Sequence, residues 1–254
     1  LPYVDNLINL LVISEAYDVG QEEMQRVLAP GGHIVFLRPS SSTPPASQKP
    51  WPIQIDQWTH FLHDSSNHAV ADDRVVWPPR SLQWVAEPRW GRHHDGLASV
   101  SAMVSAEGRL FSLIDEGPVT LIHESARWSL VARDAFYGIL LWKRALSSWQ
   151  SHLRRFRSGP PELPRRLVAV GNRVYVTLGY GAAVSALDAR SGQTVQTYAG
   201  TEGTREIVFA DDVLFLIVAD ETQRPYVARR SSAPRKPPIS HVMAVNADTG
   251  RMLW

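Results

Sequence analysis

Pairs of short apolar runs, separated by two polar or glycine residues, recur along the second half of this chain. Such pairs are typical of β-hairpins, in which a tight turn joins two antiparallel strands. We expect three of these hairpins, and they cover residues 103–111, 167–176 and 207–215.

Each of these hairpins is followed by the phrase Ala-x-[Asp/Asn]-Ala-x-x-Gly. The Asp or Asn is expected to cap a turn through its side chain, and the glycine to supply a residue that adopts a positive φ. The phrase therefore predicts a second hairpin in each unit. The residues that carry it, with the Trp that follows in two copies, are Asp134, Gly138, Trp142; Asp188, Gly192; and Asn246, Gly250, Trp254.

Two hairpins per unit give four strands, which is one blade of a β-propeller. The phrase glycines are 54 and then 58 residues apart, and a unit that recurs at roughly this period is typical of a repeat architecture. We therefore predict a mainly β chain with about three four-stranded blades over residues 57–254. Closed propellers typically have 4–8 blades, so we expect the chain to be a fragment of a longer protein.

The three-copy phrase resembles the repeat of the quinoprotein-type propellers, known as the PQQ-like repeat. That family includes bacterial pyrroloquinoline-quinone (PQQ) dehydrogenases and BamB-like outer-membrane assembly lipoproteins. The resemblance covers about Trp58 to Trp254. It implies that the phrase Trp docks on the turn of the neighbouring blade, and in the middle copy Gln196 replaces that Trp.

The first 38 residues follow a different pattern. An apolar run at residues 6–13 indicates a buried strand, residues 21–28 read as a helix, residues 29–32 stop it, and residues 33–37 form the next strand. This is a β-α-β unit of an α/β sheet. A segment of this part resembles a signature found late in class I S-adenosylmethionine-dependent methyltransferases, namely Arg26-Val27-Leu28-Ala29-Pro30-Gly31-Gly32. The resemblance implies that residues 1–38 are a C-terminal fragment of such a domain. The resemblance places the cofactor loop and the ribose-binding acid on earlier strands.

Residues 39–56 are rich in Pro and Ser and predict an extended linker between the two parts. A second such stretch, Arg229–Pro238, is interpreted as an insertion loop within the last unit. The basic run that contains Arg165 and Arg166 is interpreted as a solvated loop.

The composition of the chain limits the classes of partner that it is expected to bind. The net charge of +1 gives no global field that favours nucleic acid, and no apolar stretch is long enough for a membrane span. The chain has no Cys, which excludes thiolate metal sites in this stretch. The partner is expected to be a protein or a small molecule at the propeller face. The propeller family favours a periplasmic or cell-envelope location, whereas an active methyltransferase domain favours the cytoplasm.

The densest group of ligand-type side chains is His60, His63, Asp64 and His68. Imidazole and carboxylate together suit Zn or another transition metal, so these four are candidate metal ligands. Structural or loop histidines are the alternative interpretation.

A second group, Arg92, His93, His94 and Asp95, joins a strand to the next hairpin. Loops of a propeller gather at one end of the central channel, so these residues are candidates for anion binding by Arg and acid–base chemistry by His.

Three functions stay open. The first is a non-catalytic binding or interaction scaffold without a cofactor in this stretch. The second is an S-adenosylmethionine-dependent methyltransferase with an accessory propeller. The third is a quinone- or metal-dependent oxidoreductase, which would need PQQ and Ca²⁺ held by oxygen ligands. In the resembling enzymes an adjacent Cys pair covers the quinone, and this chain has none.

Overall fold

The computed structural model describes residues 1–14, 19–37, 46–75, 82–89, 91, 99–120, 124–147, 149, 162–219 and 240–254. Within these ranges the chain is mainly β and divides into two compact units. The larger unit contains residues 57–71, 86–134 and 139–254, and the smaller one contains residues 1–56, 72–85 and 135–138. No helix in the described ranges has the length and apolar character needed to cross a membrane.

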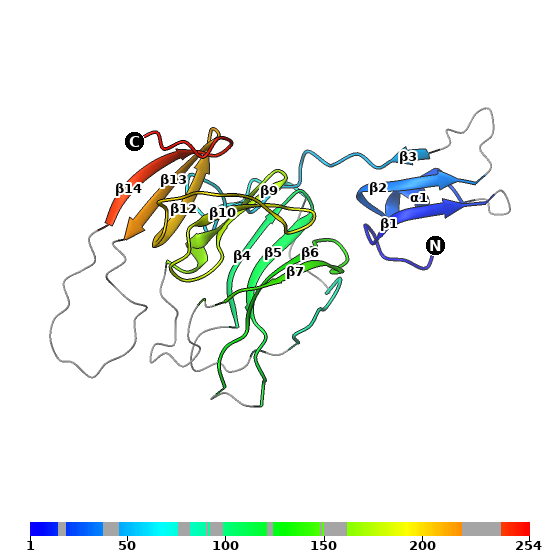
Figure 1. The fold of residues 1–254 in the computed structure, drawn as a ribbon. Coiled ribbons are helices and arrows are strands. Elements are labelled where there is room, and N and C mark those ends of the chain that lie inside the picture. The colour runs from blue at the N-terminus through cyan, green and yellow to red at the C-terminus, as the bar shows by residue number, and fades with distance from the viewer. Residues whose placement is uncertain are drawn as a thin grey trace. The chain divides into compact units, whose positions relative to one another are not determined.

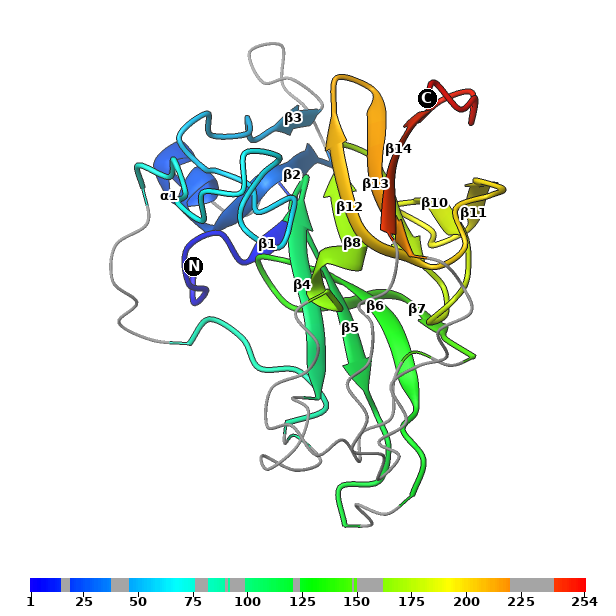
Figure 2. The same ribbon diagram turned by 90° about the vertical axis from the view of Figure 1, so that its left-hand side faces the viewer.

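The larger unit contains three antiparallel sheets, here called the first, second and third blades (Figures 1 and 2). The first blade is β4 (Val100–Ala106), β5 (Arg109–Asp115), β6 (Trp128–Asp134) and β7 (Leu140–Ala145). The second, preceded by the short 3-10 helix η1 (Pro164–Arg166), is β8 (Leu167–Val170), β9 (Arg173–Thr177), β10 (Val184–Asp188) and β11 (Thr194–Thr197). The third is β12 (Thr204–Ala210), β13 (Val213–Ala219) and β14 (Ser240–Asn246). A single bridge between Val245 and Met252 follows β14. Strands that are consecutive in the chain are neighbours in each sheet, as predicted for blades.

The three predicted hairpins are confirmed as β4–β5, β8–β9 and β12–β13. Both residues of the first and third turns adopt left-handed backbone conformations, which are typical of two-residue hairpin turns, and Gly171 in the second turn has φ of 54°. The first turn has φ values of 50° at Glu107 and 70° at Gly108, and the third has 50° at Asp211 and 60° at Asp212. The two-residue turn chemistry was therefore sufficient to place these strands.

The repeat phrase forms the predicted second hairpin in the first and second blades. In the third blade only the single bridge between Val245 and Met252 follows the phrase turn, so the described part of that blade has three strands in place of the predicted four. The Asp188 side chain accepts hydrogen bonds from the backbone N–H groups of Arg190 and Ser191. The Asn246 side chain accepts one from the N–H of Thr249 at 2.8 Å. The phrase glycines all have positive φ, at 73°, 71° and 70° for Gly138, Gly192 and Gly250.

Trp142 docks on the glycine turn of the second blade. Its indole Nε1 donates a hydrogen bond to the Ala189 carbonyl at 3.0 Å, and its ring covers Gly192 so closely that a Cβ there would lie 2.6 Å from Cε3. Docking of the phrase Trp is therefore confirmed for Trp142. Trp254, by contrast, is 63% exposed and covers no glycine turn among the described residues.

A further Trp, Trp84, docks on a glycine turn in the same way and was not predicted from the sequence. The Trp84 indole donates to the Ala135 carbonyl at 3.0 Å, and a Cβ on Gly138 would lie 2.5 Å from its ring. Trp84 follows no copy of the phrase, so the repeat pattern did not identify it.

The middle copy docks without a Trp. With the Gln196 amide oriented to suit its neighbours, its nitrogen donates to the Asp248 carbonyl and its oxygen accepts from the Gly250 N–H, both at 3.1 Å. The Tyr198 hydroxyl donates to the Ala247 carbonyl at 2.6 Å, which is the bond that the indole makes in the other copies. Gln196 and Tyr198 together therefore replace one Trp.

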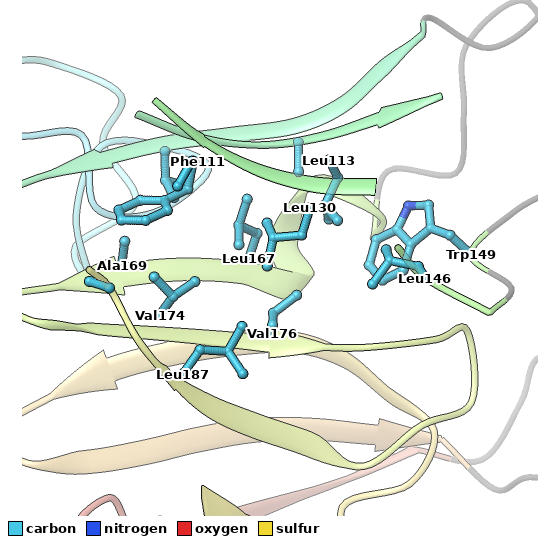
Figure 3. Packing of buried hydrophobic residues seen from close by; sticks show 14 of the residues in the cluster. Phe111, Leu113, Leu130, Leu146, Trp149, Leu167, Ala169, Val174, Val176 and Leu187 are labelled. Carbon is cyan, nitrogen blue, oxygen red and sulfur yellow. The ribbon is translucent and has the colours of Figure 1, made fainter. Parts of the chain in front are cut away.

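The blades pack on one another through two apolar cores. The first lies between the first and second blades, where the residues labelled in Figure 3 face each other across the sheets: Phe111, Leu113 and Leu130 on one side and Leu167, Val174 and Val176 on the other. The second lies between the second and third blades and includes Val168, Tyr175, Ile207, Leu214 and Val245. The first three strands of the second blade are buried along most of their length, whereas β11 is mostly exposed.

The smaller unit contains the β-α-β unit that the sequence predicts. Strand β1 (Ile8–Ile13) pairs in parallel with β2 (Leu28–Phe36), and α1 (Gln21–Val27) connects them. The Pro-Gly-Gly segment does not separate helix from strand as expected, because it lies within β2. Gly32 is needed there: a Cβ would lie 2.8 Å from the Ala29 carbonyl oxygen.

The predicted linker is partly structured. Strand β3 (Ala46–Gln48) pairs antiparallel with β2. The Lys49 ammonium donates to the Asn6 side chain and to the carbonyls of Gln25 and Leu28. The described part of the linker therefore belongs to the smaller unit. Its Pro- and Ser-rich composition does not indicate this, because the contacts of Lys49 are with residues more than 20 positions away in the chain. The insertion loop predicted at Arg229–Pro238 lies outside the described residues.

We predict that Gly192→Ala destabilises the protein far more than Gly171→Ala. Both glycines have positive φ, at 71° and 54°, so both substitutions strain the backbone by about 1 kcal/mol. Only at Gly192 does the new methyl meet an indole, whereas nothing lies within 4 Å of a Cβ at Gly171. Denaturant titration of the two variants measures the difference, and equal losses would mean that Trp142 does not cover Gly192.

We also predict that Trp142→Ala lowers the free energy of unfolding by about 3 kcal/mol, because it removes a large apolar contact and a hydrogen bond. Gln196→Ala is expected to lower it by about 1 kcal/mol, since that side chain contributes hydrogen bonds and little apolar area. Midpoints of chemical unfolding compare the two variants. A loss at Trp142 no larger than that at Gln196 would contradict the docking.

Candidate functional site

A short extended segment crosses the first strands of all three blades. This segment, Gln57–His60, is here called the strap. The backbone N–H of Ser105 in β4 donates to the Trp58 carbonyl at 2.7 Å. The N–H of Ala169 in β8 donates to the Thr59 carbonyl at 3.0 Å. The strap thus contacts successive blades with successive residues.

The third contact uses a side chain in place of a carbonyl. The backbone N–H of Phe209 in β12 donates to Nε2 of His60 at 3.0 Å. Ser105, Ala169 and Phe209 occupy the same position in their blades, two residues before the first residue of the hairpin turn. The three strands β4, β8 and β12 are edge strands of their sheets. The strap therefore satisfies one equivalent edge donor on each blade.

The first blade receives two more hydrogen bonds from the strap. The Ser105 hydroxyl accepts from the Trp58 N–H at 3.0 Å, and the Gln57 side chain accepts from the Glu107 N–H at 2.8 Å. These bonds fix the register of the strap against β4 and its turn.

His60 is held as a neutral imidazole. Since Nε2 accepts the Phe209 N–H, Nδ1 carries the proton, and it lies 2.7 Å from the Thr59 hydroxyl. Burial lowers the pKa of His60 to about 4, because the charged form would lose its hydration. Because both of its ring nitrogens are engaged in hydrogen bonds, His60 does not offer a ligand atom alongside the other three predicted metal ligands.

Those other three come together in the loop that follows the strap. His63, Asp64 and His68 each offer a ligand atom, and these atoms lie within 4.8 Å of one another. The His63 Nδ1 is 3.6 Å from an Asp64 carboxylate oxygen. The His63 and His68 rings lie 5.2 Å apart between centroids. His63 is buried, Asp64 is half-buried and His68 is exposed.

The loop is closed by its own backbone. The N–H of His60 donates to the His63 carbonyl at 3.0 Å, and the N–H of Ala69 donates to the Leu62 carbonyl at 3.3 Å. His63 and Asn67 adopt positive φ values of 78° and 61°. These ligands lie in a loop, as the sequence predicts, and the loop is a compact hydrogen-bonded turn.

The second predicted group, Arg92, His93, His94 and Asp95, lies outside the described residues. Its proposed roles in anion binding and acid–base chemistry stay predictions.

The expected solvated loop at Arg165 and Arg166 is wrong for Arg166. This side chain is 1% exposed, donates to the Tyr180 carbonyl at 2.7 Å and lies over the Tyr180 ring at 4.6 Å. Arg165 pairs with Glu206 of β12 and lies over the Phe61 ring. These two arginines attach η1 to the blades and to the loop, which a charge pattern alone could not reveal.

Comparisons with known proteins give distant structural likenesses. No family model and no curated protein matches the chain. Among solved structures, the quinohemoprotein alcohol dehydrogenase of Comamonas testosteroni is 13% identical with a TM-score of 0.45, over 79% of this chain and 27% of its own. The quinohemoprotein alcohol dehydrogenase ADHIIG of Pseudomonas putida HK5 is 14% identical with a TM-score of 0.41, over 78% and 26%. BamB of Moraxella catarrhalis is 11% identical with a TM-score of 0.26, over 61% and 49%.

The chain spans about a quarter of the length of the two dehydrogenases. Because these TM-scores are low, the evidence for the blade architecture is the strand pairing and the repeated turns described above. The resemblance of residues 1–38 to methyltransferases stays a prediction from the sequence, because none of the solved structures named above is a methyltransferase.

We predict that His60→Leu destabilises the larger unit and that His60→Gln does so less. Leu leaves the partly buried Phe209 N–H without its acceptor, a loss of about 1 kcal/mol, whereas Gln keeps an acceptor at the same distance along the side chain. Hydrogen exchange at the Phe209 amide measures the bond directly and is expected to be fastest in the Leu variant. His241→Leu, at an exposed position of β14, is the matched control, and equal effects at the two histidines would contradict the bond.

Proposed function

We propose that this chain is part of a PQQ-like propeller that acts as a non-catalytic binding scaffold. The observation that carries this proposal is the strap. Backbone and side-chain atoms of Trp58, Thr59 and His60 occupy edge-strand donors of three successive blades. The chain thus uses these positions for its own folding.

The electrostatics of the strap agree with a structural role. His60 is neutral, and both of its ring nitrogens are engaged in hydrogen bonds within the fold, so neither is available to exchange a proton with a substrate at neutral pH. A strap that joins three blades makes their relative positions rigid. A rigid set of blades presents its connecting loops as a fixed surface, which suits recognition of a protein or small-molecule partner.

The names of the structural neighbours support a second candidate. Two of them are quinohemoprotein alcohol dehydrogenases, so a quinone-dependent oxidoreductase is the alternative for a longer protein that contains this chain. Such an enzyme would bind PQQ with Ca²⁺ through oxygen ligands. The third candidate, a methyltransferase with an accessory propeller, depends on the β1-α1-β2 unit and its Pro-Gly-Gly segment.

A cofactor-binding experiment separates the first two candidates. The protein that contains this chain is incubated with PQQ and Ca²⁺, and bound quinone is measured by equilibrium dialysis together with alcohol-dependent dye reduction. The scaffold predicts neither binding nor dye reduction. Stoichiometric quinone binding with alcohol-dependent dye reduction would replace the scaffold by the oxidoreductase.

A further inference from the structure

We propose that His63, Asp64 and His68 form a binding site for one divalent transition-metal ion of the Zn²⁺ class. Two imidazoles and one carboxylate are a ligand set that such ions prefer over Ca²⁺ or Mg²⁺, which select oxygen. The three ligand atoms already lie within 4.8 Å of one another. This inference is independent of the scaffold proposal, because a metal on this loop can be structural or reactive.

The distances are close to those that coordination needs. Zn–N and Zn–O bonds are about 2.0–2.2 Å long, so two ligands of a tetrahedral ion are about 3.3 Å apart. The His63 Nδ1 and the Asp64 carboxylate oxygen are 3.6 Å apart. Since Asp64 and His68 are both accessible to solvent, small side-chain rotations bring the third ligand to the same distance. Three protein ligands leave a fourth position for water.

Neighbouring groups orient each of the three side chains. The His63 ring lies edge-on to the Trp58 ring at 5.4 Å, which ties it to the strap. One Asp64 oxygen accepts from the Ser66 N–H at 2.8 Å, and the other lies beside His63. The Nδ1 of His68 accepts from the Val70 N–H at 3.2 Å, which leaves Nε2 as the nitrogen that binds the ion. Such second contacts are what fix ring orientation at metal sites.

The same contacts couple the site to the blades. The carbonyl of His63 accepts from the N–H of His60, and His60 in turn accepts from Phe209 of the third blade. An ion that binds the folded loop and not the unfolded chain raises the stability of the strap with it. Metal binding is therefore expected to raise the melting temperature as well as to be detectable directly.

The test uses Zn²⁺ alone, added to chelator-treated protein that contains this chain. Isothermal titration calorimetry is expected to show one Zn²⁺ per chain. Thermal unfolding followed by circular dichroism is expected to show a higher melting temperature with the ion than without it. Co²⁺ in place of Zn²⁺ is expected to give visible absorption bands of a low-coordinate site. The two test variants are His68→Asn and Asp64→Asn, each of which keeps the local hydrogen-bond acceptor while removing the metal-ligand atom or its charge.

Both variants are expected to weaken Zn²⁺ binding at least about tenfold and to abolish the rise in melting temperature. His241→Asn, at an exposed histidine of β14, is the matched control and is expected to bind Zn²⁺ like the parent. Circular dichroism confirms that the variants are folded. Parent protein without Zn²⁺ binding, or variants that bind as tightly as the parent, would overturn the site.

Discussion

Contact between an aromatic ring and a glycine turn is the interaction on which the arrangement of blades depends. The Trp142 ring lies on Gly192 so closely that no residue with a Cβ fits beneath it, and its indole N–H binds the Ala189 carbonyl. The glycine meets two requirements at once, a positive φ for the turn and an open surface for the ring. This double requirement explains why the phrase keeps its glycine while its other positions vary.

The contact can be made with different side chains because it has two separable parts. One part covers the glycine, and the other donates a hydrogen bond to the carbonyl three residues before it. A Trp supplies both parts at Gly192. At Gly250 the Gln196 amide covers the glycine and the Tyr198 hydroxyl supplies the donor. The third blade therefore stays attached although the middle phrase lacks its Trp.

The sequence predicted the interactions that are local and missed those that join distant segments. Hairpin turns and phrase turns depend on residues within a few positions, so their patterns identified the blades and the role of Asp188. The strap could not be identified in this way, because His60 and Phe209 are 149 residues apart and the bond uses an ordinary strand N–H. Trp84 and Arg166 were missed for the same reason: their partners are set by the packing of sheets, and neither lies in a motif.

The strap and its loop also show why spacing alone cannot separate structural histidines from ligands. His60 and His63 are three residues apart and both are buried, yet one accepts a strand N–H and the other lies beside a carboxylate. The difference comes from the position where the chain stops being extended. His60 is the last residue that follows the blades, and the turn at His63, with φ of 78°, directs the next side chains toward one another. A loop that is anchored at one end by three blades can hold Asp64 and His68 in place while leaving them open to solvent, which is the combination that a ligand-binding loop requires.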